Sequence, residues 1–410
     1  MQLRRDSRRP WVALASNPFA GRIAALIAFG TLASLPGSAG VLPEDEADVM
    51  YHNYDGGGVT VQGPSVLIRK KIGDNFSVSY NYYVDMITSA SVDVLLSASP
   101  YKERRTQHSG SVEYQHGKTT YSVSYIHSRE PDYIADTSIF SLSQDMFGDL
   151  TTVTMSYSRG WDHVYRDIKL TDGAIVNDPT FAQQVDHRSY GVGLTQVLTR
   201  NLILSLNYQA LTDQGYLQNP YRQVVYASPG GNGWALEPQV YPGTHTTNAG
   251  SGDLKYYLPY RAALDLFYRY YTDTWGIRAN TVQLGYTQPW HHWIFDGTFR
   301  YYKQNAANFY GDFFPRADAQ NFEARDRELA AFSSYTVGVG ASYEFQIPRA
   351  PWIQKNTLNL HYDHLLIDYT DFHALRGGAD ATVIPAGGIN ELPLYRLDAN
   401  IIQLFYSLYF

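Results

Sequence analysis

The sequence predicts an all-β protein: a transmembrane antiparallel up-and-down β-barrel of about 16 strands, with 14 to 18 allowed by the pattern, preceded by a signal peptide. Three observations carry this prediction. Segments of about ten residues alternate apolar and polar side chains along most of the chain. Aromatic residues make up 15% of the 410 residues, with 35 tyrosines, which suit a boundary between apolar material and water. The connections alternate between short and long, as in membrane barrels.

The N-terminus predicts export. Residues 1–10 are rich in arginine, an apolar stretch follows at 23–35, and the small residues Gly37 and Ala39 form a cleavage signal. The apolar stretch is shorter than the roughly 18–20 residues that cross a bilayer as a helix. We therefore expect residues 1–39 to be a cleaved signal peptide, 40–46 an acidic periplasmic segment, and 47–410 a single barrel domain.

Composition excludes several classes of function. The chain contains no cysteine, which excludes disulfides, cysteine-ligated metals and cysteine nucleophiles. Its formal net charge is −7, and loss of an arginine-rich signal peptide makes it more acidic, which argues against a nucleic-acid partner. We expect the cell outer membrane of a Gram-negative bacterium as the location, with outer-membrane lipid and the barrel-assembly machinery as partners.

The alternation defines the strands and their number. In 76–86, for example, Phe76 and Val78 alternate with Ser77 and Ser79, and the small, uncharged polar face suits a wet lumen wall. The pattern is clear from 59–72 onwards and gives an odd number of segments. An even count therefore requires one more strand at 47–55, followed by a turn at Gly56, Gly57 and Gly58.

Aromatic residues near the segment ends predict two girdles at the membrane interfaces. These residues are Trp161, Trp275, Trp290, Trp293, Trp352, Tyr256, Tyr257 and Tyr260.

The connections give the orientation. Short ones, such as 72–75, 116–119 and 199–201, are expected in the periplasm, and longer ones outside the cell. The long connections are expected at about 91–105, 162–186, 212–244, 306–330 and 370–395. Within them, the Gly- and Pro-rich stretch 219–243 is expected either to plug the lumen or to cover its mouth.

The stretch DVMYHNYDGGGVTVQGPSVLIRKKIGDNFSVSYNYYVDMITSASVDVLLSASPYKERRT (48–106) and the block DMFGDLTTVTMSYSRGWD (145–162) resemble an uncharacterised family of Gram-negative outer-membrane proteins, a domain of unknown function. The resemblance implies an outer-membrane barrel and brings no established activity. Members of that family tend to be encoded near small lipoproteins, thioredoxin-like proteins and flavin transferases. This implies, by association only, a role beside exported redox proteins.

Histidine-rich motifs suggest no chemistry of their own. In HYDH (361–364), His361 and Asp363 share one face of a strand while His364 points the other way, which favours lumen-facing polar residues over a metal site. His291 and His292 lie between two tryptophans at a short turn and are interpreted as girdle residues. We predict no catalytic, cofactor-binding or metal-binding residues, and no cofactor.

The densest group of charges in the sequence suggests a pore constriction, because a loop folded into a lumen can select solutes by charge. The alternative is a solvated external loop whose charges pair with one another. The residues concerned are Arg316, Asp318, Glu323, Arg325, Asp326, Arg327 and Glu328.

The expected function is a porin-like channel or a membrane scaffold without catalytic activity. One alternative is a binding or assembly partner for exported redox proteins or lipoproteins. Another, less favoured, is an outer-membrane hydrolase, which would need a serine and a histidine on adjacent strands at the outer rim.

The chain ends in ANIIQLFYSLYF (399–410), in which Tyr406, Leu408 and Phe410 share one face. Because soluble proteins usually fray into polar residues at this end, we expect the last strand to close the barrel against the first. We also expect these three residues to form an assembly signal. Deleting Phe410 should lower the yield of folded barrel in the outer membrane, measured in membrane fractions. An unchanged yield would contradict this prediction.

Overall fold

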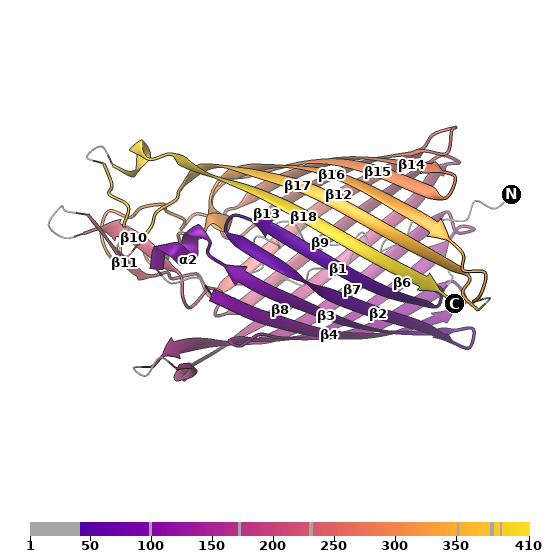
Figure 1. Cartoon of the computed structure of the whole chain (residues 1–410), viewed down its shortest axis with the longest axis horizontal. Coiled ribbons are helices and arrows are strands. Elements are labelled where there is room, and N and C mark those ends of the chain that lie inside the picture. The colour runs from indigo at the N-terminus through magenta and orange to yellow at the C-terminus, as the bar shows by residue number, and fades with distance from the viewer. Residues whose placement is uncertain are drawn as a thin grey trace.

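The protein is all-β, as predicted. The computed structural model describes residues 42–97, 101–170, 174–228, 233–350, 352–377, 381–385 and 388–410. Sixteen strands of these residues form one closed antiparallel barrel (Figure 1). They are β1 (Glu46–Gly56), β2 (Val59–Ile72), β3 (Phe76–Ser89), β4 (Tyr101–His116), β5 (Thr119–Arg129), β6 (Tyr133–Met146), β7 (Thr151–Lys169), β8 (Ile175–Thr199), β9 (Leu202–Gly215), β12 (Thr244–Tyr257), β13 (Ala263–Asp273), β14 (Arg278–Trp290), β15 (Trp293–Gln304), β16 (Phe332–Phe345), β17 (Lys355–His373) and β18 (Leu394–Tyr409).

Small elements occupy the connections. A separate two-stranded sheet, β10 (Gln223–Ala227) with β11 (Trp234–Pro238), lies between β9 and β12. The helix α2 (Val92–Ser97) precedes β4, and two 3-10 turns, η1 (Arg327–Leu329) and η3 (Ile389–Glu391), precede β16 and β18. Within the described part of the chain, no helix has the length and apolar character needed to cross a membrane.

The barrel closes between its first and last strands. β1 pairs antiparallel with β18, with Val49 opposite Tyr406 and Gly56 opposite Ala399. The extra strand expected at 47–55, its glycine turn and the closing role of the last strand are therefore confirmed. Leu408 faces Ala47 across this seam. The Phe410 amide donates to the carbonyl of Asp45 at 3.1 Å, and Lys70 lies over its ring.

The two ends of the barrel differ in their connections. At the turn end, which also holds the start of β1 and the end of β18, strands are joined by short turns such as 73–75 and 117–118 (Figure 1, right). At the loop end lie the long segments 216–243, 305–331 and 374–393. The loop expected at 162–186 is wrong: β7 and β8 continue as a long hairpin that projects at the loop end (Figure 1).

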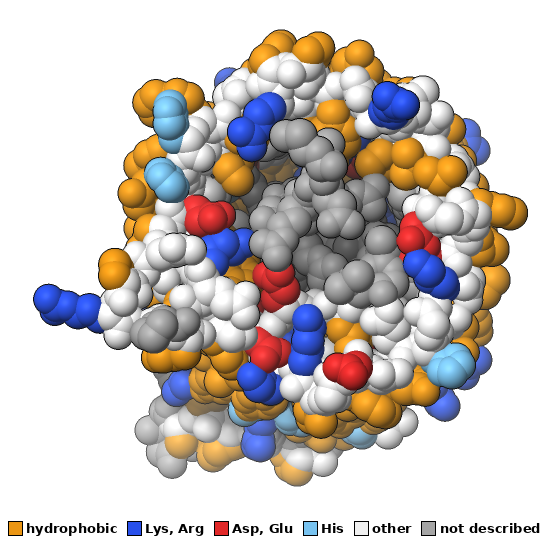
Figure 2. Space-filling model, turned by 90° about the vertical axis from the view of Figure 1, so that its right-hand side faces the viewer, with side chains coloured by type: hydrophobic (Ala, Val, Ile, Leu, Met, Phe, Trp, Pro, Cys, Tyr) orange, Lys and Arg blue, Asp and Glu red, His pale blue; other side chains and the backbone are white. Residues whose placement is uncertain are grey.

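The outer wall is apolar. The successive outward side chains of β13, Leu264, Leu266, Tyr268 and Tyr270, are each 42–47% exposed. A soluble monomer rarely leaves such continuous apolar surface uncovered, whereas a barrel in lipid requires it. In a view onto the turn end, hydrophobic side chains form the outer circumference and acidic ones lie nearer the axis (Figure 2).

Tyrosines limit the apolar wall at both ends. On five strands, an outward tyrosine donates its hydroxyl to a polar side chain of the next strand, two positions nearer the loop end. These pairs are Tyr51 with Gln62, Tyr125 with Asp136, Tyr208 with Asn248, Tyr268 with Asn280 and Tyr362 with Asn400. At the turn end, Tyr406 donates to Asn356 and Tyr286 to Gln288. Rings inside the apolar band and hydroxyls directed out of it are what a membrane interface selects.

The predicted girdle residues agree with this pattern except for two: Trp275, and Tyr257, which follows the outward Tyr256 on β12 and therefore faces the lumen. Trp290, Trp293 and Trp352 are exposed at the turn end. Trp275 is only 4% exposed: its ring stacks on His245 with centroids 3.9 Å apart, and its indole N–H donates to the carbonyl of Thr244. It belongs to a buried cluster at the loop end because the segments there fold inwards.

Two glycines let side chains meet across an intervening strand. Gly63 of β2 lies opposite His52 of β1, and a Cβ there would stand 1.9 Å from the Val84 carbonyl oxygen of β3. Without that Cβ, His52 Nε2 reaches Asp85 at 2.8 Å. Gly340 does the same between Asp296 on β15 and His361 on β17, whose Oδ2 and Nε2 lie 3.3 Å apart.

Gly63→Ala should therefore prevent the barrel from packing correctly, because the new Cβ would meet backbone that cannot move without breaking the β2–β3 ladder. We expect a loss of roughly 1–3 kcal/mol or more in the free energy of unfolding. Urea titration followed by heat-modifiable electrophoretic mobility would measure it. Gly250→Ala on β12 is the matched control, since a Cβ there meets nothing within 4 Å. Equal stability of the two variants would contradict this account.

Candidate functional site

Two parts of the chain fold together at the loop end of the barrel, and we call them the cap: the described residues of 216–243, which are 216–228 and 233–243, and residues 305–331. Leu217, Tyr241, Phe309 and Leu329 of the cap form one buried cluster with inward side chains of β6, β7 and β8. The backbones of the two segments also pair, at Val240 with Glu323 and at Tyr226 with Phe314. The cap therefore packs against the inner face of the wall at the loop end, while β10 and β11 lie beyond the ends of the barrel strands (Figure 1). Of the two expectations for 219–243, this position favours a cover over the mouth.

A buried ion cluster joins the two cap segments. Arg222 of the first segment lies 2.6 Å from an oxygen of Asp326 and 2.8 Å from one of Glu328, both in the second segment. Tyr241 and Gln239 also donate to Asp326. The three charged side chains are between 5% and 16% exposed. We call Arg222, Asp326 and Glu328 the latch.

Glu328 of the latch keeps its charge at low pH. Burial alone would raise the pKa of Glu328, but the charges of Arg222 and Arg327 and the hydrogen bond from Arg222 outweigh it and lower the pKa to about 2. Glu328 is therefore ionised at any physiological pH, and Arg222 is the nearer of its two counter-charges.

A second anchor fixes the cap to the barrel wall. Arg325 pairs with Asp312 at 2.8 Å, donates to the carbonyl of His373 at the end of β17, and lies over the ring of Phe372. His373 itself lies 2.6 Å from Asp312. The Gln304 amide at the end of β15 donates to the carbonyls of Glu328 and Ala330.

The seven charged residues singled out in the sequence thus separate into two groups. Glu323, Arg325, Asp326, Arg327 and Glu328 are each at most 7% exposed, so a solvated external loop is wrong for them. Arg316 and Asp318 are exposed; Arg316 donates to the carbonyls of Ala317 and Asp318, within its own loop.

The lumen wall beneath the cap carries a continuous polar belt. Imidazole and carboxylate groups alternate along it: His187 bridges Asp162 at 3.0 Å and Asp213 at 2.6 Å, and His245 bridges Asp213 at 3.3 Å and Asp273 at 3.0 Å. A tyrosine hydroxyl ends the belt on each side, Tyr133 at Asp162 and Tyr271 at Asp273. These seven residues come from β6, β7, β8, β9, β12 and β13, which are adjacent in the barrel.

Sequence reasoning missed the belt. Four of its residues lie within or beside 162–186 and 212–244, which were expected to be loops, so their inward alternation was not followed. The sequence does hold one signal: Asp162 lies two residues after Gly160, the spacing that places two residues on the same face of a strand. In the structure, Asp213, His245 and Asp273 all lie close to strand ends. No pattern in a single sequence shows that strands so far apart along the chain bring these imidazole and carboxylate groups into contact.

The predicted directions of the HYDH side chains are confirmed. His361 and Asp363 face the same side, with Nδ1 and Oδ2 3.1 Å apart, while His364 contacts Asn400, which is exposed on the outer wall. His291 and His292 form the tight turn between β14 and β15, and His291 adopts φ 54°. Among the described residues, no three His, Asp or Glu side chains converge as metal ligands would.

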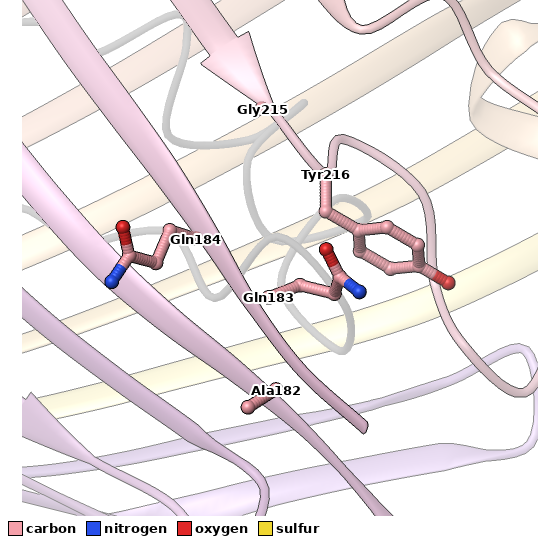
Figure 3. Close-up of a pocket in the computed structure, with 5 residues that line it drawn as sticks. All are labelled: Ala182, Gln183, Gln184, Gly215 and Tyr216. Atoms are coloured by element: carbon pink, nitrogen blue, oxygen red, sulfur yellow. The ribbon is translucent and has the colours of Figure 1, made fainter. Parts of the chain in front are cut away.

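A pocket of about 440 Å³ opens at the loop end where β9 stops and β8 continues. Gln183 and Tyr216 extend to one side of the β8 ribbon and Gln184 to the other, with Ala182 and Gly215 completing the lining (Figure 3). Amide and phenol groups offer hydrogen bonds but no acid, base or nucleophile chemistry at neutral pH. The belt and cap therefore remain the chemically distinctive part of the interior.

A family model described as a protein of unknown function, DUF3570, matches residues 91–365. The chain belongs to the DUF3570 family. The matched range holds both cap segments and every residue of the belt, so these features lie in the part of the chain that the family shares. The first of the two stretches that carried the resemblance begins before this range, and the second lies inside it. The comparison with curated proteins gives no match.

This DUF3570 protein is similar to several solved structures, each at low identity. The siderophore receptor PirA of Acinetobacter baumannii aligns with a TM-score of 0.44 and 11% identity over 90% of this chain, which spans 60% of that receptor. A bacterial polysaccharide outer membrane secretin aligns with a TM-score of 0.46 and 7% identity, over 90% of this chain and 100% of the secretin. The outer membrane protein OpdK of Pseudomonas aeruginosa aligns with a TM-score of 0.42 and 9% identity, over 90% of this chain and 99% of OpdK.

Removing the cation of the latch should release the cap. Arg222→Met would remove the nearest counter-charge of Asp326 and Glu328 and leave Arg327, 3.9 Å from Glu328, as the remaining cation. Breaking a buried ion pair costs up to roughly 3–5 kcal/mol. We expect proteinase K to cleave the purified, folded barrel within 216–243 or 305–331. Arg316→Met is the matched control, because it removes an exposed arginine of the same cap that contacts only nearby carbonyls. Equal cleavage of the two variants would contradict the latch.

Acid gives a second measurement of the same latch. The pKa of Glu328 falls from its ordinary 4.5 to about 2 in the folded protein. Its stabilising contribution is therefore complete above pH 4.5 and is lost as the pH falls through 2. Wild-type protection against an acid protease such as pepsin should persist at pH 4.5 and decline towards pH 2.

Proposed function

We propose that this protein is an outer-membrane channel for small polar solutes, with no catalytic activity of its own, whose loop end is narrowed by the cap. The observation that carries the proposal is the position of a folded, ion-paired cap at the mouth of a barrel whose inner wall bears the Asp–His belt. Barrels of this strand number enclose room for water, as 16–18-stranded porins do. A protein that acted only as a membrane anchor would have no use for a charged lining there.

The belt supports a preference for cations. Its three carboxylates, Asp162, Asp213 and Asp273, outnumber its two histidines, so the belt is negatively charged whatever the protonation of the imidazoles. Rings of acidic side chains favour cations in channels. Each histidine contacts two carboxylates and therefore holds them at fixed places on the wall.

The buried charges of the cap have a different part in this proposal. Arg325, Asp326, Arg327 and Glu328 fix the cap in the lumen, and solutes pass between the cap and the belt. The constriction is thus formed by the cap as a body rather than by the row of charges in its sequence. Arg316 and Asp318 lie outside the latch and have no part in the constriction.

The orientation follows from the connections. We propose that the turn end faces the periplasm and the loop end the exterior, because external loops are the longer ones in such barrels. Residues 1–39, the proposed cleaved signal peptide, lie outside the described residues. The rows of outward tyrosines at both ends of the apolar wall support a position across the bilayer with a hydroxyl row in each headgroup layer.

Planar-bilayer recordings of purified protein test the channel. We expect wild type to give small, cation-selective steps, and Arg222→Met to give steps several times larger because the cap no longer narrows the lumen. Arg316→Met should conduct like wild type. Asp213→Asn, which removes the central carboxylate of the belt, should reduce the cation preference in reversal-potential measurements with a KCl gradient.

The outcomes separate the candidate functions. Folded wild type and folded Arg222→Met that both fail to conduct would overturn the channel proposal. If a periplasmic or lipoprotein partner then co-purified with the barrel, the assembly role expected as an alternative would take its place. A hydrolase activity abolished by one Ser→Ala change would replace both.

A further inference from the structure

Two arginines face each other on the outer wall of the barrel. Arg159 of β7 lies directly opposite Arg188 of β8, and their side chains are 52% and 49% exposed. Both pair with a single carboxylate: Arg159 lies 2.9 Å from one oxygen of Asp186, and Arg188 lies 3.0 Å from the other. We call Arg159, Asp186 and Arg188 the outer clamp. It carries one more positive charge than negative.

The clamp is costly as it stands. Like charges directly opposite on a sheet destabilise the strand pair, and cations on the lipid-facing wall cost up to roughly 2–4 kcal/mol, falling to about 0–1 near the interface. A third partner that brings negative charge would remove both costs. The clamp therefore has the composition of an anion site.

Its height on the wall identifies the kind of anion. Arg159 and Arg188 lie two positions nearer the loop end than Tyr157 and Tyr190, which also face each other, with ring centroids 5.2 Å apart. The polar side chains that accept hydrogen bonds from the outward tyrosines also lie two positions nearer the loop end than their tyrosine. Those tyrosines mark the edge of the apolar band. Trp161, opposite Asp186, is exposed beside the clamp. A ligand held there has its apolar part against the wall and its charged group at the interface.

We propose that the outer clamp binds a phosphate group of an anionic glycolipid in the outer leaflet. Each guanidinium group has five N–H donors, of which the contact with Asp186 uses only part, and the remaining donors suit phosphate oxygens. The exposed Arg129, on the outer face of β5 two strands from β7, adds positive charge to the same side of the wall. The proposal rests on the orientation given above, with the loop end outside.

Native mass spectrometry of the detergent-purified barrel tests the site with three lipid probes: bisphosphorylated lipid A, monophosphorylated lipid A and phosphatidylethanolamine. We expect wild type to retain the bisphosphorylated probe most strongly, the monophosphorylated one less, and the zwitterionic one least. In Arg159→Gln/Arg188→Gln, the apparent Kd for bisphosphorylated lipid A should rise about tenfold, as expected for loss of charge-assisted hydrogen bonds.

Arg278→Gln/Lys303→Gln is the matched control. These residues are also exposed cations on the outer wall near the loop end, on β14 and β15, and their loss should change the Kd less than twofold. Heat-modifiable mobility establishes that both variants fold. Equal weakening of lipid binding in the two variants would show attraction to overall charge and would overturn the clamp. Displacement of the lipid from the wild-type protein by millimolar inorganic phosphate would also overturn the glycolipid site. Because the assay needs neither conductance nor a membrane orientation, its failure is distinct from failure of the channel.

Discussion

The structure depends on one constraint: in hydrocarbon, every backbone N–H and C=O group must be paired within the protein. Helices meet it locally, but strands meet it only when the sheet has no edge. The pairing of β1 with β18 removes that edge. Once it forms, the period-two alternation places one set of side chains in lipid and the other in the lumen. The apolar wall, the tyrosine rows and the polar interior all follow from that division.

The interior meets a second demand that the wall does not. Polar groups that face inwards beneath a folded cap lose contact with bulk water, and buried charges are stable only when they are paired. The belt, the latch and the pair formed by His52 and Asp85 are three solutions to this problem. In each, an ionic side chain contacts groups from other strands or segments rather than its sequence neighbours, so the same contacts that satisfy charge also fix the shape of the lumen.

The difference between local and non-local contacts explains what the sequence predicted. Alternation, turn residues and parity depend on neighbouring residues, and they gave the barrel, its even strand count and the strand before Gly56. The strand structure within 162–186 and the burial of Trp275 could not be predicted from neighbouring residues. The long β7–β8 hairpin depends on a partner strand, and Trp275 is buried because the cap folds over it. The latch joins residues about a hundred positions apart, and no periodicity connects Arg222 with Asp326 or Glu328.

The side-chain contacts that pass over Gly63 and Gly340 have a consequence for the order in which the barrel assembles. Each joins a histidine and an aspartate across three consecutive strands: β1 to β3 through Gly63, and β15 to β17 through Gly340. Contacts between segments close in sequence form with little loop-closure entropy, whereas the β1–β18 seam joins the two ends of the barrel domain. The two triplets can therefore set their register early: the first contains the edge strand β1, and the second supplies β17, the partner on which the edge strand β18 pairs. Closure then becomes the docking of two ordered borders rather than a search by two flexible ones.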